Sequence, residues 1–262
     1  MILEARQLTV RRGGADVVRD LSLVARPGEM LGLIGPNGAG KTSLLRALCE
    51  LDPVAEGTVL LDGQPASDFG AQRLGRTVSY LAQSGRIHWP LRVEEVVALG
   101  RLPHGESIVD AAVQRAMGAA DILHLRGRTT GALSGGERAR VLLARALAVE
   151  APILLVDEPV ASLDPYHQLQ VMEVLRATAR GAVAVVAVLH DLTLAARFCD
   201  RLLLMANGQS LAEGEPAHVL APARVRRAYG VSVETGQRHG EPFILPWRRC
   251  PSPPETQTSH EA

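Results

Sequence analysis

Apolar residues in this chain form short uninterrupted runs that alternate with stretches of helical spacing. Three of the runs are wholly apolar, as expected of strands that are buried on both faces: residues 30–34, 153–156 and 182–189. Helical stretches lie between and around them, at residues 43–50, 135–150, 165–180 and 192–199. Apolar strands that alternate with helices predict a largely parallel sheet that is covered by helices on both faces.

Further strands are predicted around this core from shorter or alternating segments. They are residues 2–10, 17–25, 57–61 and 77–81, with a turn at 11–14, and two hairpins made of 201–205 with 210–213 and of 231–235 with 243–245. Two short helices, 216–220 and 223–229, are predicted between the hairpins.

The middle of the chain has a different pattern. Residues 84–133 show no strand-like alternation but contain two helical stretches, 91–101 and 107–125, which are separated by a break at Pro103. Ser107 and Asp110 are placed to cap the second helix. We interpret this segment as a helical insertion between two parts of one domain.

The predicted domain therefore covers residues 1–246, with the core formed by 1–83 and 134–246 and the insertion by about 84–133. Residues 247–262 are rich in Pro, Ser, Thr and Glu and are predicted to be a disordered tail.

Composition narrows the class of partner. Apolar residues make up 47% of the 262 residues and aromatics 3%, so the core is aliphatic. The 28 basic and 28 acidic side chains cancel, which argues against a nucleic-acid partner. The three cysteines are scattered and are expected to be reduced thiols. No signal peptide is expected at the start of the chain, and the longest apolar run, residues 182–189, is far below the roughly 20 residues that span a bilayer. A role at a membrane would thus depend on a partner.

The strongest chemical signal follows the first buried strand. Residues 35–42 match the pattern G-x-x-x-x-G-K-[ST], in which glycines let successive amides point into one concavity and the next helix adds its positive end. Lys41 would reach the outer phosphates, and Thr42 offers a hydroxyl to Mg²⁺. The predicted nucleotide-binding residues are Gly35, Pro36, Asn37, Gly38, Ala39, Gly40, Lys41, Thr42 and Ser43.

A second signal is the pair of carboxylates at the end of the strand at 153–156. Ligands of α/β sheets bind at the carboxyl ends of strands. Asp157 is placed to hold Mg²⁺ through its hydration shell, and Glu158 to polarise a water in line with the γ-phosphate. Together with the phosphate loop, the pair predicts nucleotide hydrolysis.

A third signal is the sequence Leu-Ser-Gly-Gly-Glu at residues 133–137. Taken alone, it fits an ordinary helix start in which Ser134 and Glu137 form a capping box. On these five residues alone the ordinary helix start is the stronger interpretation, and the alternative is a second anion site made by Ser134, Gly135, Gly136 and Glu137. A second anion site in a chain that already has a phosphate loop suggests a nucleotide clamped between two copies.

With these motifs in order, the chain from residue 2 to about 245 resembles the nucleotide-binding subunit of an ATP-binding-cassette (ABC) transporter. Residues 35–42 resemble the Walker A loop, 153–158 Walker B and 133–137 the signature motif. Gln83 resembles the Q-loop glutamine, residues 162–164 the D-loop and His190 the switch histidine. The implied fold is α/β: a P-loop NTPase (RecA-like) core with an antiparallel β subdomain and an inserted helical subdomain.

The resemblance implies a role for each of these residues. ATP would lie between two head-to-tail copies, so that Lys41 and the loop amides hold its phosphates while Ser134 and Gly136 of the other copy close on them. Thr42, Gln83 and Asp157 would bind Mg²⁺, and Asp164 would cross the interface. Glu158 would act on the attacking water and His190 would stabilise the developing charge, with Lys41 and Gln83 completing the catalytic set.

Arg12 departs from the family pattern. The family has an aromatic residue near the end of the first strand, which stacks on adenine, and Arg12 occupies that place here. Either its guanidinium plane stacks on the base or it is a solvated turn residue.

The run at residues 93–104 in the insertion is similar to ATPases of importers for iron(III)-siderophores, haem and cobalamin. This implies a peripheral ATPase on the cytoplasmic face of a bacterial inner membrane, bound to an integral membrane permease and served by a periplasmic or surface binding protein. Residues 84–90 would then lie near the permease. The alternatives are the ATPase of another ABC system, such as an exporter, or a soluble ABC ATPase without a transport role.

Overall fold

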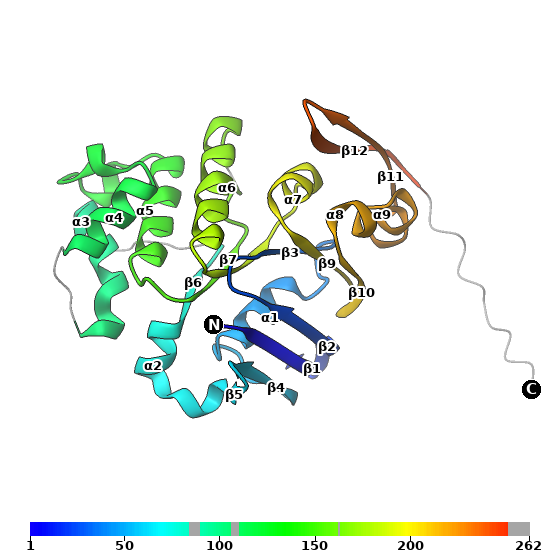
Figure 1. The fold of residues 1–262 in the computed structure, drawn as a ribbon, viewed down its shortest axis with the longest axis horizontal. Helices are drawn as coiled ribbons and strands as arrows, with labels where there is room; N and C mark the ends of the chain where they lie inside the picture. The colour runs from blue at the N-terminus through cyan, green and yellow to red at the C-terminus, as the bar shows by residue number, and fades with distance from the viewer. Residues whose placement is uncertain (84–89, 106–109, 162, 251–262) are drawn as a thin grey trace, which may run out of the picture.

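The computed structural model describes residues 1–83, 90–105, 110–161 and 163–250. Within these residues no helix is both long and apolar enough to cross a membrane. A six-stranded sheet, a four-stranded sheet, a two-stranded hairpin and several helices make up the described part of the chain, with a group of helices at one end of the largest sheet (Figure 1).

The larger sheet has six strands in the order β10-β9-β3-β8-β7-β6. Its strands are β3 (Met30–Ile34), β6 (Val78–Leu81), β7 (Ile153–Asp157), β8 (Ala184–Val188), β9 (Arg201–Ala206) and β10 (Gln209–Gly214). All neighbours are parallel except β10, which pairs antiparallel with β9 at one edge. The predicted largely parallel sheet is therefore confirmed.

The smaller sheet is antiparallel, in the order β2-β1-β4-β5. It comprises β1 (Leu3–Arg12), β2 (Ala15–Ala25), β4 (Glu56–Leu61) and β5 (Gln64–Pro65). The turn predicted at residues 11–14 is shorter than expected, because Arg11 and Arg12 continue β1 and pair with Asp16 and Ala15.

Alternate side chains of the larger sheet enter two separate cores. Leu31 and Leu33 face the antiparallel sheet and α1 (Lys41–Leu48), whereas Met30 and Ile34 belong to the core on the opposite face. That second core is covered by α5 (Gly135–Leu147), α6 (Pro165–Arg180) and α7 (Leu192–Phe198). Burial on both faces explains why these strands have no polar alternation.

The helical insertion has a third core of its own. Its elements are α3 (Val93–Ala98), the 3-10 helices Leu99–His104, Leu123–Leu125 and Thr130–Ala132, and α4 (Ala111–Ala119). They pack on Val141 and Ala144 of α5, so one helix serves both the insertion and the sheet. Asp110 caps α4 as predicted, accepting from the Val113 amide at 2.9 Å, while Ser107 lies outside the described residues.

One predicted helix is too long, and one helix was not predicted. The second helical stretch does not run to Leu125, because α4 ends at Ala119. A helix at α2 (Gly70–Thr77), preceded by a 3-10 turn at Ala66–Phe69, was not predicted at all, and it takes Thr77 from the expected strand. Thr77 is the one buried residue of α2, so the segment has no apolar stripe that would identify it.

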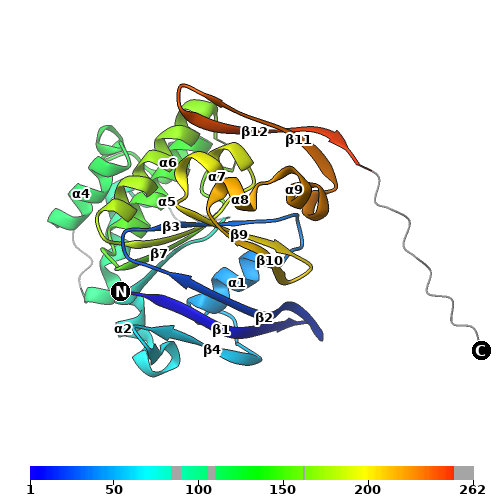
Figure 2. The same cartoon turned by 45° about the vertical axis from the view of Figure 1, so that its right-hand side comes forward.

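The chain continues through α8 (Pro216–Val219) and α9 (Pro222–Tyr229) into a hairpin of β11 (Val231–Arg238) and β12 (Glu241–Arg249). Figure 2 shows the hairpin lying across α7 and α9. The Thr193 hydroxyl of α7 donates to the Ile244 carbonyl at 2.9 Å and accepts from the Ile244 amide at 3.0 Å. Because β12 continues to Arg249, the predicted tail starts too early, and residues 251–262 lie outside the described part of the chain.

Candidate functional site

The phosphate loop connects β3 to α1 and depends on two glycines. Gly35 has φ +148°, and a Cβ there would stand 2.2 Å from the Met205 carbonyl oxygen of β9. Gly40 has φ +95°, and its Cβ would stand 2.3 Å from the Val17 carbonyl oxygen. Side chains are thus excluded at both ends of the loop by backbone atoms of neighbouring strands. Gly40 is also the N-cap of α1 and offers no side-chain cap, so the first amides of α1 stay available to an anion.

Lys41 is held by its own loop. Its Nζ donates to the carbonyl oxygens of Gly35 at 2.7 Å and Pro36 at 3.0 Å, and the residue is 6% exposed. Burial lowers the pKa of Lys41, while the nearby carboxylates of Glu158 and Asp157 act in the opposite direction. The Lys41 ammonium thus bonds two carbonyls of its own loop and lies inside the site where a phosphate would bind.

Asp157 ends β7 and is 1% exposed. Its Oδ1 accepts from the Thr42 hydroxyl at 3.2 Å, and its Oδ2 accepts from the Tyr80 hydroxyl at 3.5 Å. Burial raises the pKa of Asp157, since little water solvates the carboxylate. The same burial, with the charge of Asp157, raises the pKa of Tyr80.

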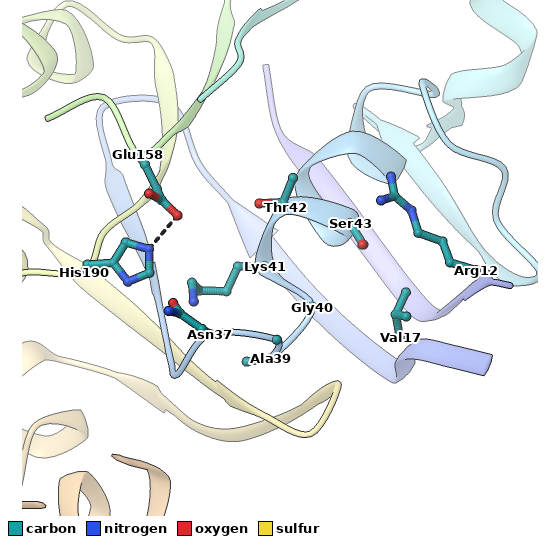
Figure 3. A pocket seen from close by; sticks show the side chains of 11 residues that line it. Arg12, Val17, Asn37, Ala39, Gly40, Lys41, Thr42, Ser43, Glu158 and His190 are labelled. Atoms are coloured by element: carbon teal, nitrogen blue, oxygen red, sulfur yellow. Dashed lines mark hydrogen bonds and ion pairs between the residues drawn. The ribbon is translucent and has the colours of Figure 1, made fainter. Parts of the chain in front are cut away.

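Glu158 follows Asp157 in a strained conformation, with φ +50°. Its amide donates to the Val188 carbonyl of β8 at 3.2 Å. Its two carboxylate oxygens accept from different partners: Oε2 from Gln83 Nε2 at 2.6 Å, and Oε1 contacts His190 Nε2 at 2.5 Å. The carboxylate of Glu158 therefore points toward His190 (Figure 3).

These residues surround a pocket of about 310 Å³. Figure 3 places Arg12 at one end and the Glu158–His190 pair at the other, with the phosphate loop between them. The lining residues are Arg12, Val17, Asn37, Gly38, Ala39, Gly40, Lys41, Thr42, Ser43, Glu158 and His190. The pocket is polar and cationic where a phosphate chain would lie, and Glu158 is its one acidic lining residue among those that the structure describes.

Arg12 lies at the last position of β1 and is paired with a carboxylate. Its guanidinium forms an ion pair with Asp52, which also accepts from Arg46 Nη2 at 2.8 Å. Arg46, and after it Arg12, hold the pKa of Asp52 below its usual range. Arg12 therefore ends a strand and does not lie in the predicted turn. Its side chain is 47% exposed, and stacking on a base stays a prediction.

The segment at residues 133–137 starts α5 and does form a capping box. The Ser134 hydroxyl accepts from the Glu137 amide at 3.2 Å, and Glu137 Oε2 accepts from the Ser134 amide at 2.7 Å. The hydroxyl proton remains free to donate, and both Ser134 and Gly135 are exposed. Cap and anion site are thus compatible, but none of residues 134–137 lines the described pocket.

Asp164 caps α6 beside this segment. Its Oδ1 accepts from the His167 amide at 3.0 Å, and its Oδ2 contacts His167 Nδ1 at 2.7 Å. The bond from the His167 amide lowers the pKa of Asp164. A Cβ on Gly136 would lie 3.6 Å from Leu163, so the loop before α6 packs against the start of α5. Ser162, the first residue of the expected D-loop, is outside the described residues.

The structure groups the predicted residues into two sets. The phosphate loop, Glu158 and His190 form one site with Arg12, whereas residues 134–137 and Asp164 form a separate surface. The expected metal set is divided, because Thr42 contacts Asp157 while Gln83 bonds to Glu158. Tyr80 and Val17 were missed. Neither carries a motif, and their contribution depends on β6 lying next to β7 and on β2 lying beside the loop.

A glycine loop on a parallel sheet, with paired carboxylates on a nearby strand, defines a P-loop nucleotide-binding protein. A family model for ABC transporters matches residues 18–161. The chain is 47% identical over 255 residues to the hemin import ATP-binding protein HmuV of Pseudomonas aeruginosa, a match that covers 93% of this chain and 99% of that protein. The chain therefore belongs to the ABC transporter family.

Solved structures show the same fold. An inward-facing conformation described as that of a metal-chelate type ABC transporter superposes with a TM-score of 0.79 at 22% identity, covering 94% of this chain and 97% of that one. The dimeric structure of MJ0796, a bacterial ABC transporter cassette, superposes with a TM-score of 0.73 at 24% identity over 82% of this chain and 98% of the other. The predicted fold class and the resemblance to ABC ATPases are thereby confirmed.

Proposed function

We propose that this chain is the ATP-hydrolysing subunit of a haem importer, acting on a separate membrane permease. The strongest support is the 47% identity to a hemin import ATP-binding protein, which extends over 93% of this chain and 99% of that protein. The sequence alone left siderophore, haem and cobalamin complexes open, and the hemin import relative directs the proposal to haem. It would work at the cytoplasmic face of a bacterial inner membrane, with a periplasmic or surface binding protein delivering the substrate.

The pocket supports ATP as its nucleotide. The triphosphate would lie along the loop amides and the free first turn of α1, with Lys41 turning from the loop carbonyls to the outer phosphates. The base would lie at the other end, between the Arg12 guanidinium and Val17. The ion pair with Asp52 keeps Arg12 in place for stacking.

The side-chain oxygens of Thr42 and Asp157 are suitable ligands for a magnesium ion. Mg²⁺ prefers oxygen ligands and is commonly bound by one or two carboxylates together with substrate phosphates. The Thr42 hydroxyl and the Asp157 carboxylate already lie 3.2 Å apart, so one ion could contact both. When bound, the ion would neutralise charge on the phosphates. Gln83 would join this set after leaving Glu158.

Glu158 is the base that the geometry favours. Glu158 lines the pocket, its side chain is 16% exposed, and its carboxylate contacts His190 Nε2 at 2.5 Å. It would accept a proton from the attacking water, while His190 would donate toward the γ-phosphate oxygens as negative charge develops there. Before it joins the magnesium set, Gln83 holds this carboxylate in place through its bond to Oε2.

A second copy would complete the site. The exposed Ser134 hydroxyl and the amides of Gly135 and Gly136 form an anion-binding helix start that does not line the pocket of its own chain. In a head-to-tail dimer it would close on the γ-phosphate of the partner, with Glu137 holding the box and Asp164 crossing between the copies. The dimeric cassette of the same fold supports this arrangement.

Haem uptake tests the proposal. Cells lacking the chain would be given haem, a ferric siderophore or cobalamin, and complemented with the wild type or with Lys41→Ala. Wild-type chain should restore growth on haem as the iron source, and Lys41→Ala should not. If the wild-type chain restores use of the siderophore or cobalamin and not of haem, the substrate assignment changes to that complex. ATP-driven export would support the alternative that the chain is the ATPase of an exporter.

A further inference from the structure

The two ends of the helical insertion are joined by a short antiparallel pairing. The Thr130 amide donates to the Leu91 carbonyl at 3.0 Å, and the Val93 amide donates to the Arg128 carbonyl at 3.0 Å. Arg92 and Thr129 face one another in an isolated antiparallel bridge. The chain that enters α3 is thus bonded to the chain that leads into α5.

Arg128 extends this pairing to the capping box of α5. Its Nη1 donates to Glu137 Oε1 at 3.0 Å, and its Nη2 donates to the Ala132 carbonyl at 2.8 Å. The other oxygen of Glu137 accepts from the Ser134 amide at 2.7 Å. One carboxylate therefore bonds the arginine on one side and Ser134 on the other.

These bonds stabilise the ionised carboxylate. The Ser134 amide, with smaller contributions from the Ser134 hydroxyl and the Arg128 charge, lowers the pKa of Glu137. Glu137 is consequently an acceptor at neutral pH, and a fork-shaped guanidinium fixes both the carboxylate and the Ala132 carbonyl just before the box.

We propose that Arg128 is a positioning residue for ATP hydrolysis, which sets the place of the Ser134 hydroxyl through Glu137. The inference rests on the proposed function, because Ser134 must reach the nucleotide of a second copy. The Arg128 side chain is 45% exposed and contributes little to the core, so its removal should change turnover more than folding. Without Arg128, Ser134 would be held only by its mutual bonds with Glu137 in the first turn of α5.

Two arginine variants and a matched control test this role in the full chain with its permease. Arg128→Gln removes the charge and the fork, Arg128→Lys keeps the charge but reaches one acceptor, and Arg126→Gln changes an exposed arginine two residues earlier. The measurements are kcat and KM for ATP, together with the thermal midpoint. We expect Arg128→Gln to lower kcat by about fivefold, with KM and midpoint unchanged and partial recovery in Arg128→Lys.

A double-variant cycle tests the route through Glu137. If Arg128 acts through that carboxylate, adding Arg128→Gln to Glu137→Gln should cost no further turnover. Wild-type kcat in Arg128→Gln, an equal loss in Arg126→Gln, or losses that multiply in the double variant would each overturn the inference. Because the readout is ATP turnover, a cargo other than haem would overturn the import proposal and leave this result intact.

Discussion

The substitution Glu158→Gln separates chemistry from binding most sharply. The carboxylate accepts from Gln83 at 2.6 Å and contacts His190 at 2.5 Å, in a pocket where it is the one acidic side chain among the described lining residues. Glutamine has the same shape, can still accept from Gln83 and can still bond to His190. What it loses is the ability to take a proton from water.

The magnitudes differ enough to distinguish the two effects. Loss of a general base lowers turnover by about 10² to 10⁴, or roughly 3–5 kcal/mol of barrier. Exchanging one charged hydrogen bond for a neutral one costs about 1 kcal/mol of folding free energy. ATP affinity should hold or rise, because a negative charge near the triphosphate disappears. The variant should therefore bind ATP and remain folded while turnover nearly stops.

The assay is phosphate release at saturating Mg-ATP, beside equilibrium nucleotide binding and size-exclusion chromatography with ATP. Glu173→Gln, on the exposed face of α6, is the matched control and should behave as wild type. The variant should also accumulate as an ATP-bound dimer. Turnover within tenfold of wild type would refute the assignment of Glu158 as the base. Loss of ATP binding would refute the expectation that removing this negative charge preserves or raises ATP affinity.

Two further substitutions test the burial and the backbone of the site. Asp157→Asn should raise the thermal midpoint of the nucleotide-free chain at pH 7, since a carboxyl whose pKa is raised by folding costs stability as pH rises above the unfolded value. The gain should shrink toward about pH 4, while Mg-dependent turnover is lost; a lower midpoint at pH 7 would contradict the reasoning. Gly38→Ala should cost about 1–2 kcal/mol of strain at φ +80° with open space around it. Gly35→Ala should cost more in urea unfolding, because its Cβ would meet the Met205 carbonyl, and equal losses would be inconsistent with that contact.

Chemistry at strand ends was predictable from the sequence because apolar runs mark buried strands and α/β sheets carry ligands where those strands end. Both carboxylates of the 157–158 pair, the phosphate loop and the start of α5 were identified in this way. Their partners were not predictable. Whether Gln83 bonds to a metal or to Glu158 depends on a rotamer, and the contact of Tyr80 with Asp157 depends on β6 being the neighbour of β7.

The helix and the hairpin that the sequence analysis missed or made too short contain few buried residues. Hydrophobic periodicity shows which face of an element is covered, and α2 has a single buried residue, Thr77. The hairpin of β11 and β12 was predicted but too short, because Ile244 is the one buried residue of β12 and every residue after it in the strand is exposed. The position of the hairpin depends on tertiary contacts, here the hydrogen bonds between Thr193 of α7 and Ile244 of β12.

The position of β3 in its sheet has a consequence for synthesis of the protein. Met30 pairs with Val185 on one side, and Leu31 pairs with Arg201 on the other. At about 5–20 residues per second, a ribosome needs roughly 8–30 s to make the intervening chain. During that interval the strand that carries the phosphate loop has neither neighbour. A nascent chain of this protein should thus gain its nucleotide site late and in one step, and until then the apolar strand would need shelter from aggregation.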